Sequence, residues 1–411
     1  MPAIAFGLPD EVATTCDGIA DFAEREVLPR HRRHADVFDD PRRRFRDDGR
    51  LADEVVQEIR EVRMAAAAEG FFTMCVPEGL GGGGLGHLAY YAAWQRLFHR
   101  CGPRNWLMLY VLSHWAFGPS RLLERMSGEA RERVLPGLMD GSRSMCFGLT
   151  EPGAGSDASR LATTAVRDGD GWRIDGGKIY TSNGALADYC VVFAVTDAAA
   201  RDAGRGGITA FLVPTAAEGF EVVRVLRLFG QLGSDEVELR FEGVRAEPWQ
   251  VVGEEHQGFR AALYGVSLGR VYNSARAVGY GRWAVERALA YAAEREAFGT
   301  TISEFQGVSF PLADSATELH AAHLMGLNAA TLLDRGEPAV KELSMTKAYS
   351  VQAGLRAVDR AIQTHGGRGF LSELGLTEAW QALRVVNVAD GTNEILARTI
   401  ARRLFAGDTD L

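Results

Sequence analysis

The spacing of hydrophobic residues predicts helices through the first 140 residues of the chain. In 53–69 the apolar positions recur every three or four residues, which places them on one face of a helix. The segments 88–100 and 105–125 are more apolar throughout and are expected to be buried helices. Ser127 precedes another periodic segment and is a suitable N-cap, because its hydroxyl can accept a hydrogen bond from the first helical turn.

The pattern changes near Ser144, where short runs of β-branched and aromatic residues replace the helical spacing. The expected strands are 172–175, 189–196, 208–214, 220–225 and 237–241. Glycine-containing turns such as 168–171 and 204–207 separate them, and the loop 198–207 is expected to be exposed. Short, regularly spaced strands with such turns are typical of an antiparallel sheet or barrel.

Helical spacing returns near residue 257 and continues to the end of the chain. The expected helices are 258–296, 303–334, 338–364 and 377–405. A chain of 411 residues is long enough for two or three subdomains. The predicted fold class is mixed α and β, mainly α, with an N-terminal all-α domain over 1–143, a middle β domain over 144–255 and a C-terminal helical bundle over 256–411.

Composition and charge exclude several classes of protein. The chain is 46% hydrophobic and 24% charged, which is typical of a soluble globular protein. Its net charge of −9 gives no electrostatic footprint for nucleic acid. Arginines at 42, 43, 44 and 46 form a basic run, but aspartates at 39, 40, 47 and 48 flank it. This run is therefore expected to be a solvated face that neutralises itself.

Cysteine spacing and the apolar segments indicate a cytoplasmic protein. The five cysteines, at 16, 75, 101, 146 and 190, form no CxxC pair and have no metal-ligand spacing with a histidine. We therefore expect a reducing compartment and no metal site. The N-terminal segment 1–12 lacks the basic start and apolar core of a signal peptide, and the apolar run 107–112 is too short to span a membrane.

The nine-residue segment 149–157, LTEPGAGSD, is the most distinctive candidate for chemistry. Its glycines allow a ligand to approach backbone N–H groups, and Thr150 and Ser156 add hydroxyl donors. From the residues alone, an ordinary polar turn is the more common explanation of such a cluster, and a ligand-binding loop is the alternative. The glycines at 81, 83 and 86 fit GxGxxG, but helix follows where a second strand should be, so we expect a flexible loop at a pocket mouth.

Four later segments carry further candidate residues. In 178–184, KIYTSNG, an extended chain would place Tyr180 and Ser182 on one side, although the NG pair also suits a hairpin turn. The others are REAFG at 295–299 with Gln306 close by, QTHGG at 363–367 and ADGTNEI at 389–395. Taken singly, an arginine at a helix end or an Asp-Gly turn before a helix is usually structural.

These five motifs, in this order, resemble those of the acyl-CoA dehydrogenase family, and the likeness extends from about residue 13 to 404. The resemblance implies an N-terminal helical domain, a middle antiparallel β-barrel-like domain and a C-terminal four-helix bundle. It also implies one FAD per subunit and a homotetramer built as a dimer of dimers, or a homodimer. The implied partners are an acyl-CoA or acyl-carrier-protein thioester and an electron-transfer flavoprotein, with no nucleic acid and no membrane.

The resemblance assigns roles residue by residue. Cofactor contacts are expected from Phe147, Leu149, Thr150, Gly155, Ser156, Tyr180, Ser182, Arg295, Phe298, Gln306, Gln363, Gly366, Gly367, Thr392 and Glu394. The motif at 363–367 is expected to reach the FAD of a neighbouring subunit. Substrate contacts are expected from Ser156, Arg270 and Gly391, and Asp390 is the expected base.

The implied reaction is α,β-dehydrogenation to a trans-2-enoyl thioester. Asp390 would remove the α-proton while hydride leaves the β-carbon for flavin N5. The family usually has glutamate there, and the other place for a base in this family is occupied by Gly269, which cannot act as one. Aspartate reaches about 1.5 Å less far, so the substrate must lie closer or differ from a plain fatty acyl chain.

Further departures leave the substrate open. An Arg-Asp pair usual in the family is replaced by Gln381 and Ala382, and Ala397 stands where the family often has arginine. An aspartate base also resembles that of nitroalkane oxidases. Those enzymes couple the aspartate to an arginine seven residues later, and this chain has Ala397 there instead. A carrier-protein-linked acyl group is the other alternative. His114 and Trp115 could block long chains or could simply belong to the core.

Overall fold

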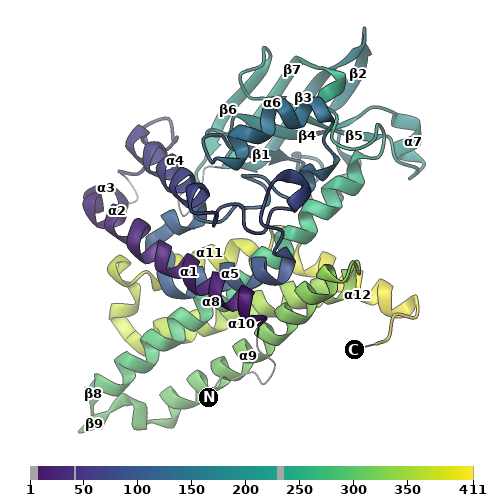
Figure 1. Cartoon of the computed structure of the whole chain (residues 1–411). Coiled ribbons are helices and arrows are strands. Elements are labelled where there is room, and N and C mark those ends of the chain that lie inside the picture. Colours follow the sequence, from purple (N-terminus) through teal and green to yellow (C-terminus); the bar gives the residue numbers. More distant parts are fainter. Residues whose placement is uncertain (1–7, 41–42, 229–235, 411) are drawn as a thin grey trace. The chain divides into compact units, whose positions relative to one another are not determined.

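The computed structural model describes residues 8–40, 43–228 and 236–410, and these form two compact units (Figure 1). The bundle unit groups Met1–Arg33, Leu85–Met108 and Gly269–Leu411, and the sheet unit groups His34–Gly84 and Leu109–Leu268. The predicted domain boundaries at 143/144 and 255/256 stay a prediction. Arg42 of the basic run and the first seven residues of the N-terminal segment lie outside the described residues.

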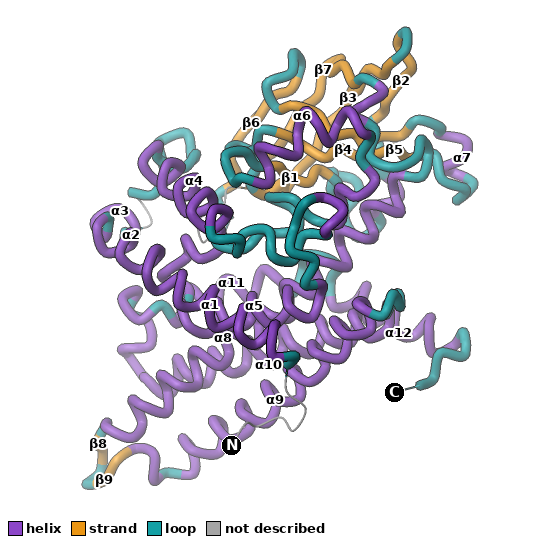
Figure 2. Tube along the Cα trace, in the orientation of Figure 1, coloured by secondary structure: helices purple, strands orange, loops and turns teal. Residues whose placement is uncertain are grey.

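The sheet unit contains seven paired strands, which Figure 2 shows as one orange group. They are β1 (Met145–Gly148), β2 (Thr164–Asp168), β3 (Gly171–Ser182), β4 (Tyr189–Val195), β5 (Ile208–Pro214), β6 (Phe220–Leu226) and β7 (Glu236–Ala246). Their order is β1-β4-β2-β3-β7-β6, with β5 also paired to β4. The five expected strands are present, whereas β1 and β2 were not predicted as strands.

The prediction of an antiparallel sheet is wrong for two of the pairings. β1 runs parallel to β4, with Met145 opposite Tyr189, and β2 meets β4 in parallel at Thr164 and Val195. The other pairs are antiparallel. Alternate residues of β4 enter two different hydrophobic cores, so this strand is buried on both faces, as central strands with parallel neighbours usually are.

The helices and turns that precede the sheet in the chain match the predicted elements only in part. α4 (Asp53–Ala68) and α6 (Gly128–Met139) form as expected, and Ser127 Oγ accepts the Ala130 N–H at 3.0 Å. The helix expected over 105–125 is wrong. That segment forms two 3-10 turns, η3 (Pro103–Tyr110) and η4 (Arg121–Arg125), joined by buried irregular chain. Pro119 helps to break it, because proline cannot donate a helical hydrogen bond.

Three surface predictions have different outcomes. Arg43 and Arg46 are exposed and pair with Asp36 and Asp53, but Arg44 is buried, so the run is not a uniformly solvated face. The loop with the glycines at 81, 83 and 86, just before α5 (Gly86–Cys101), is packed rather than open: a β-carbon on residue 83 would lie 2.7 Å from the Met74 carbonyl oxygen. The exposed loop 198–207 contains a short helix, α7 (Ala198–Asp202).

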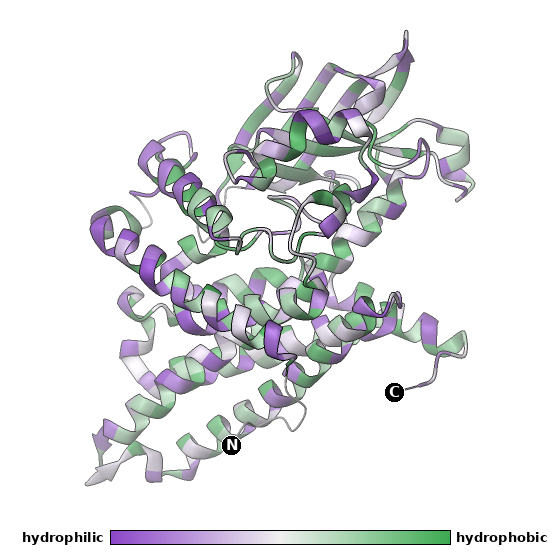
Figure 3. Ribbon diagram, in the orientation of Figure 1, coloured by the Kyte–Doolittle hydropathy of each residue, from purple (hydrophilic) through white to green (hydrophobic). Residues whose placement is uncertain are grey.

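The bundle unit is built from long helices. These are α1 (Asp10–Phe22) with η1 (Ala23–Val27) and α2 (Leu28–Arg33), α5 (Gly86–Cys101), α8 (Gly258–Glu294), α9 (Gln306–Asp334), α10 (Val340–His365), α11 (Leu376–Val386) and α12 (Asn393–Phe405). α10 packs against α9, α11 and α12, and α5 packs against α1 and α9. Figure 3 shows hydrophobic and hydrophilic residues mixed along them, as expected of helices with one buried face.

Two breaks in the bundle unit matter for function. The hairpin of β8 (Glu296–Ala297) and β9 (Thr300–Thr301) joins α8 to α9. The single helix expected over 377–405 is wrong, because a turn at 387–392 separates α11 from α12. Within the described residues, no helix is long and apolar enough to cross a membrane.

Candidate active site

The turn between α11 and α12 places Asp390 at the centre of a polar cluster. Asp390 has a left-handed backbone with φ of +52°, and Gly391 follows with φ of +98°. Aspartate and glycine are among the residues that tolerate this region best. Thr392 then caps α12, since its Oγ1 accepts the Ile395 N–H at 3.3 Å. The motif 389–395 is thus both a turn and a helix cap, and it also presents a carboxylate.

Helix α8 contacts this carboxylate directly. Asn273 Nδ2 donates to Asp390 Oδ2 at 2.7 Å, and Arg270 Nε donates to the Asp390 backbone oxygen at 3.2 Å. Gly269 lies one helical turn before Asn273, on the same face of α8. Because Gly269 has no side chain, the carboxylate can lie against the helix backbone.

Helix α10 holds the other side of the turn. The Lys347 residue is fully buried, and its Nζ donates to the Gly391 backbone oxygen at 2.8 Å. Ser344, one turn earlier on α10, accepts a long hydrogen bond of 3.4 Å from Arg270 Nη1. Two cationic side chains therefore fix the backbone carbonyls of residues 390 and 391.

The electrostatics of this cluster suit a general base. Burial raises the pKa of Asp390 to about 6, while the positive charges of Lys347 and Arg270 and the Asn273 hydrogen bond oppose the rise. Burial also lowers the pKa of Lys347, against the attraction of the Asp390 carboxylate. A carboxylate whose pKa lies near the working pH is ionised often enough to accept a proton and basic enough to remove one.

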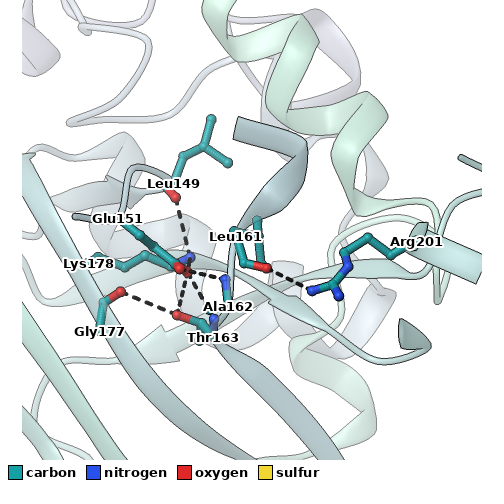
Figure 4. Close-up of polar contacts among 8 residues, drawn as sticks. All are labelled: Leu149, Glu151, Leu161, Ala162, Thr163, Gly177, Lys178 and Arg201. Atoms are coloured by element: carbon teal, nitrogen blue, oxygen red, sulfur yellow. Dashed lines mark hydrogen bonds and ion pairs between the residues drawn. The ribbon is translucent and has the colours of Figure 1, made fainter. Parts of the chain in front are cut away.

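A second buried cluster lies in the sheet unit and joins two of the predicted motifs (Figure 4). Lys178 Nζ donates to Glu151 Oε1 at 2.6 Å and to the Leu149 carbonyl at 3.3 Å. The Glu151 carboxylate also accepts from Thr163 Oγ1 at 2.6 Å and from the N–H groups of Ala162 and Thr163 at 2.5 and 3.0 Å. Lys178 and these donors outweigh the effect of burial and hold the pKa of Glu151 below its usual value.

Tyr180 lies next to this cluster in the chain, at an irregularity of β3. The Ile179 N–H donates to the Thr150 carbonyl at 2.9 Å, and β3 shifts register against β7 between Lys178 and Thr181. At this bulge Tyr180 has φ of +56° and a side chain 57% exposed. A plain extended strand is therefore wrong for this segment, although Tyr180 and Ser182 both flank the buried Thr181.

The remaining sheet-unit candidates divide into buried and exposed groups. Leu149 is buried in the core, and Phe147 packs edge-on against Trp115 with ring centroids 4.9 Å apart. Gly155 and Ser156 are exposed, and among the described residues their N–H groups donate to no atom of the chain. The Ser182 hydroxyl, by contrast, donates to the Glu236 carboxylate at 2.6 Å.

His114 and Trp115 fit the core interpretation. His114 stacks on Phe117 with centroids 4.1 Å apart, and Trp115 is 6% exposed. A β-carbon on Gly265 of α8 would lie 2.8 Å from the Trp115 ring, so the ring fills the space that this glycine leaves.

The other candidates lie at the far end of the bundle unit. Figure 1 shows β8 and β9 at one end of this unit and α12 at the other. Arg295, Phe298 and Gln306 surround that hairpin and are exposed, Phe298 by 97%. Tyr291 stacks on His365 with centroids 4.5 Å apart, which brings the end of α10 to the same place.

The end of α10 carries the motif 363–367. Gln363, Gly366 and Gly367 are exposed there, and nothing lies within 4 Å of a β-carbon built on either glycine. Within one chain, the motifs at 295–306 and 363–367 therefore lie close to each other, but they do not lie beside Asp390.

Sequence reasoning missed four residues of these two clusters. Asn273 could have been found because it follows Gly269 by four residues on a helix and so shares its face. Lys347 is a lysine among buried residues of α10, a pattern that marks a buried charge. Glu151 and Lys178 lie inside two recognised motifs, but nothing in the sequence indicates that they pair.

Comparison with known proteins gives matches along almost the whole chain. Three family models match: acyl-CoA dehydrogenase N-terminal domain over 9–142, middle domain over 146–244 and C-terminal domain over 256–405. A subunit of the caffeyl-CoA reductase–Etf complex of Acetobacterium woodii is 31% identical over 94% of this chain and 96% of its own length.

Two solved structures are similar throughout. Butyryl-CoA dehydrogenase from Megasphaera elsdenii has a TM-score of 0.82 at 26% identity, covering 98% of this chain and 100% of its own. The FAD complex of PigA has a TM-score of 0.84 at 25% identity, covering 98% and 99%. These likenesses agree with the helical, sheet and helical segments described above.

Proposed function

Because the chain belongs to the acyl-CoA dehydrogenase family, we propose that it oxidises an acyl-CoA thioester to the trans-2-enoyl-CoA with Asp390 as base. The family makes the protein a FAD-dependent oxidoreductase. One observation carries the assignment of the base: the Asp390 carboxylate is held by Asn273 and Arg270 in a turn where burial raises its pKa to about 6.

Each unit, taken by itself, has residues whose chemistry suits FAD. The bound FAD would supply the acceptor for the hydride that leaves the substrate β-carbon. The exposed Tyr180 ring can shield one face of a flat heterocycle, and the unused N–H groups of Gly155 and Ser156 can donate to its polar edge. The open backbone at Gly366 and Gly367 can approach a pyrophosphate.

The expected cofactor contacts do not all come from one chain in this proposal. Thr150, Tyr180 and Ser182 are the sheet-unit candidates for contact with the chain's own cofactor, and Thr392 and Glu394 are the bundle-unit candidates. The group at the far end of the bundle unit would serve a neighbour's, and it comprises Arg295, Phe298, Gln306, Gln363, Gly366 and Gly367. The Ser182 hydroxyl must leave Glu236 before it can donate to a ring nitrogen.

In the proposed reaction Asp390 accepts the substrate α-proton. Lys347 and Arg270 favour the ionised form of the carboxylate before the transfer. The Gly391 N–H would donate to the thioester oxygen, where negative charge develops as the α-proton leaves. Arg270, which was expected to contact substrate, makes its hydrogen bonds to the Asp390 carbonyl and to Ser344, so its role here is to hold the turn.

Partners follow from the same proposal. An electron-transfer flavoprotein would take the electrons, in agreement with the Etf complex that contains the Acetobacterium relative. A homotetramer, or a homodimer, is supported by large apolar side chains exposed on the bundle unit. These are Leu289, Phe298, Phe310 and Phe370, with exposed fractions of 52, 97, 57 and 71%. We place the enzyme in the cytoplasm, without nucleic acid or membrane partners.

Two substrate classes are open within this reaction. The Megasphaera structure is a butyryl-CoA dehydrogenase, and the Acetobacterium relative belongs to a caffeyl-CoA reductase. A short aliphatic thioester and a 3-arylpropionyl thioester are therefore the first compounds to compare. The shorter reach of aspartate, about 1.5 Å less than that of glutamate, applies to both classes.

Anaerobic titration of the FAD-loaded protein tests the proposal. Butyryl-CoA, octanoyl-CoA and 3-phenylpropionyl-CoA are added separately while the flavin absorbance is followed. Bleaching by one class, with formation of the enoyl-CoA, is the expected result and identifies the substrate. If none of the thioesters bleaches bound FAD, the acyl-CoA assignment is wrong, and a carrier-protein thioester and a nitroalkane are tested next.

A further inference from the structure

We propose that Asn273 is a positioning residue that fixes which oxygen of Asp390 receives the substrate proton. Its amide holds Oδ2, and this leaves Oδ1 to accept the α-proton. The inference rests on the proposed function, because it assigns a task to one atom of the proposed base.

The geometry of α8 supports this assignment. Asn273 is 4% exposed, and its Nδ2 lies 2.7 Å from Asp390 Oδ2. Among the described residues, Asp390 Oδ1 accepts no hydrogen bond from a side chain or from the backbone. The two carboxylate oxygens are therefore unequal before any substrate binds.

The nearby cations do not orient the Asp390 carboxylate as the Asn273 amide does. Arg270 on α8 and Lys347 on α10 donate to the backbone carbonyls of residues 390 and 391, not to the carboxylate. Asn273 is neutral, so it orients the carboxylate without forming an ion pair that would weaken the base strongly. Asn273 therefore positions the carboxylate and lowers its pKa as one neutral donor, while the two cations act on the carboxylate through their charge alone.

The charged and titratable groups around Asp390 come from three helices. Arg270 and Tyr272 lie on α8 and Lys347 on α10, while Glu394 on α12 acts on Lys347. Replacing Asn273 leaves all of these charged and titratable groups in place. A hydrogen bond to the ionised form of an acid lowers its pKa, so losing it must raise the pKa of Asp390.

The position of the Asn273 donor fits an aspartate at residue 390 better than a glutamate. Gly269 opens the space beside α8, and Asn273, one turn later, supplies the donor at the depth that an aspartate carboxylate reaches. A glutamate would carry its oxygens about 1.5 Å further along. The Asn273 hydrogen bond should therefore matter much less in the Asp390→Glu background.

Stopped-flow reduction of the FAD-loaded enzyme, with whichever of butyryl-CoA and 3-phenylpropionyl-CoA bleaches it, tests the inference. Asn273→Leu keeps a similar side-chain volume and removes the donor. We expect flavin reduction to slow by about tenfold or more, because misplacing a reacting group by ~1 Å can cost 10²-fold. The acid limb of the pH profile should move to higher pH, while FAD content stays unchanged.

The control and the second variant separate positioning from folding. Ser274→Ala removes a neighbouring hydroxyl that, within the described part of the chain, bonds its own helix at the Arg270 carbonyl, and should leave rate and profile as they are. Asn273→Asp preserves shape and sets a like charge beside Asp390, so its acid limb should move further than that of Asn273→Leu. This variant decides the matter if the leucine variant does not fold.

The outcomes distinguish this inference from the proposed function. Wild-type rate and pH profile in Asn273→Leu, or an equal loss in the Asp390 and Asp390→Glu backgrounds, would overturn the positioning role. Flavin reduction that survives in Asp390→Asn would instead overturn the assignment of the base. A loss that is large with aspartate and under twofold with glutamate supports the inference.

Discussion

Gly269 on α8 and Asp390 in the turn between α11 and α12 share one space. A β-carbon built on Gly269 would lie 2.3 Å from Asp390 Oδ2 and 2.6 Å from its Cγ, far inside van der Waals contact. The carboxylate therefore lies where a side chain on α8 would otherwise be. An acid at position 269 and an acid at position 390 exclude each other in this packing, which explains why glycine accompanies the aspartate.

Gly269→Ala is expected to impair the reaction more than the fold. The added methyl group must displace the Asp390 carboxylate, and we expect flavin reduction by substrate to fall by at least about tenfold. Gly307→Ala on α9 is the matched control, since nothing lies within 4 Å of its β-carbon. The control should keep full activity and gain up to ~1 kcal/mol in the free energy of unfolding. Equal activities of the two variants would refute the shared-space argument.

Asp390→Asn should retain FAD and lose reduction by thioester. The amide keeps the shape of the side chain but cannot accept the α-proton. In the unmodified enzyme the same reduction rate should rise with pH through about 6, because the raised pKa keeps Asp390 protonated below that value. Rapid mixing from pH 5 to 8 measures both effects, and a flat profile would contradict the assignment of Asp390.

Lys347→Met should move the acid limb of this profile to higher pH. The buried ammonium stabilises the ionised carboxylate, so its removal raises the pKa of Asp390. The Gly391 carbonyl also loses its 2.8 Å donor, which should lower the free energy of unfolding by about 1–3 kcal/mol. Lys347→Arg, which keeps the charge, is the control for the pH profile. An unmoved limb in Lys347→Met would show that its charge does not reach the base.

Lys178→Met should destabilise the sheet unit strongly. It leaves the Glu151 carboxylate buried without its cation, and breaking such a pair typically costs about 3–5 kcal/mol. Adding Glu151→Gln to Lys178→Met should restore part of the loss, because the uncompensated charge is removed. Arg245→Met breaks the exposed pair with Asp170 and should cost at most about 1 kcal/mol. Urea unfolding compares the variants, and equal losses in Lys178→Met and Arg245→Met would contradict this account.

The sequence predicts the long periodic helices of this fold better than it predicts which strands pair with each other. α4, α8, α9 and α10 follow from apolar spacing alone, because each buries one continuous face. The parallel pairing of β1 with β4 does not follow, since it joins strands that are distant in the chain and carry no local signal. The turn at 387–392 was recognised for its chemistry, yet it was placed inside one helix, because the apolar spacing continues on both sides of it.

The residues of the candidate site also divide into those that a local motif predicts and those that only the packing brings together. Asp390 and the loop 149–157 are found because their motifs are short and local. Asn273 and Lys347 reach Asp390 and Gly391 only through the packing of three helices, so no stretch of sequence contains the cluster. The left-handed Tyr180 is a further example, since its bulge lies in the pairing of β3 with β7, two strands that are distant in the chain.

Figure 1 shows the β8–β9 end of the bundle unit well apart from α12, and under the proposed function this separation would link cofactor retention to protein concentration. Residues gathered at that end would serve the cofactor of a neighbouring chain, so each chain would complete the site of a neighbour. Dilution that separates the chains would then release FAD before any helix unfolds, and added FAD would draw the chains together by mass action. The yellow colour of the protein would thus report its assembly.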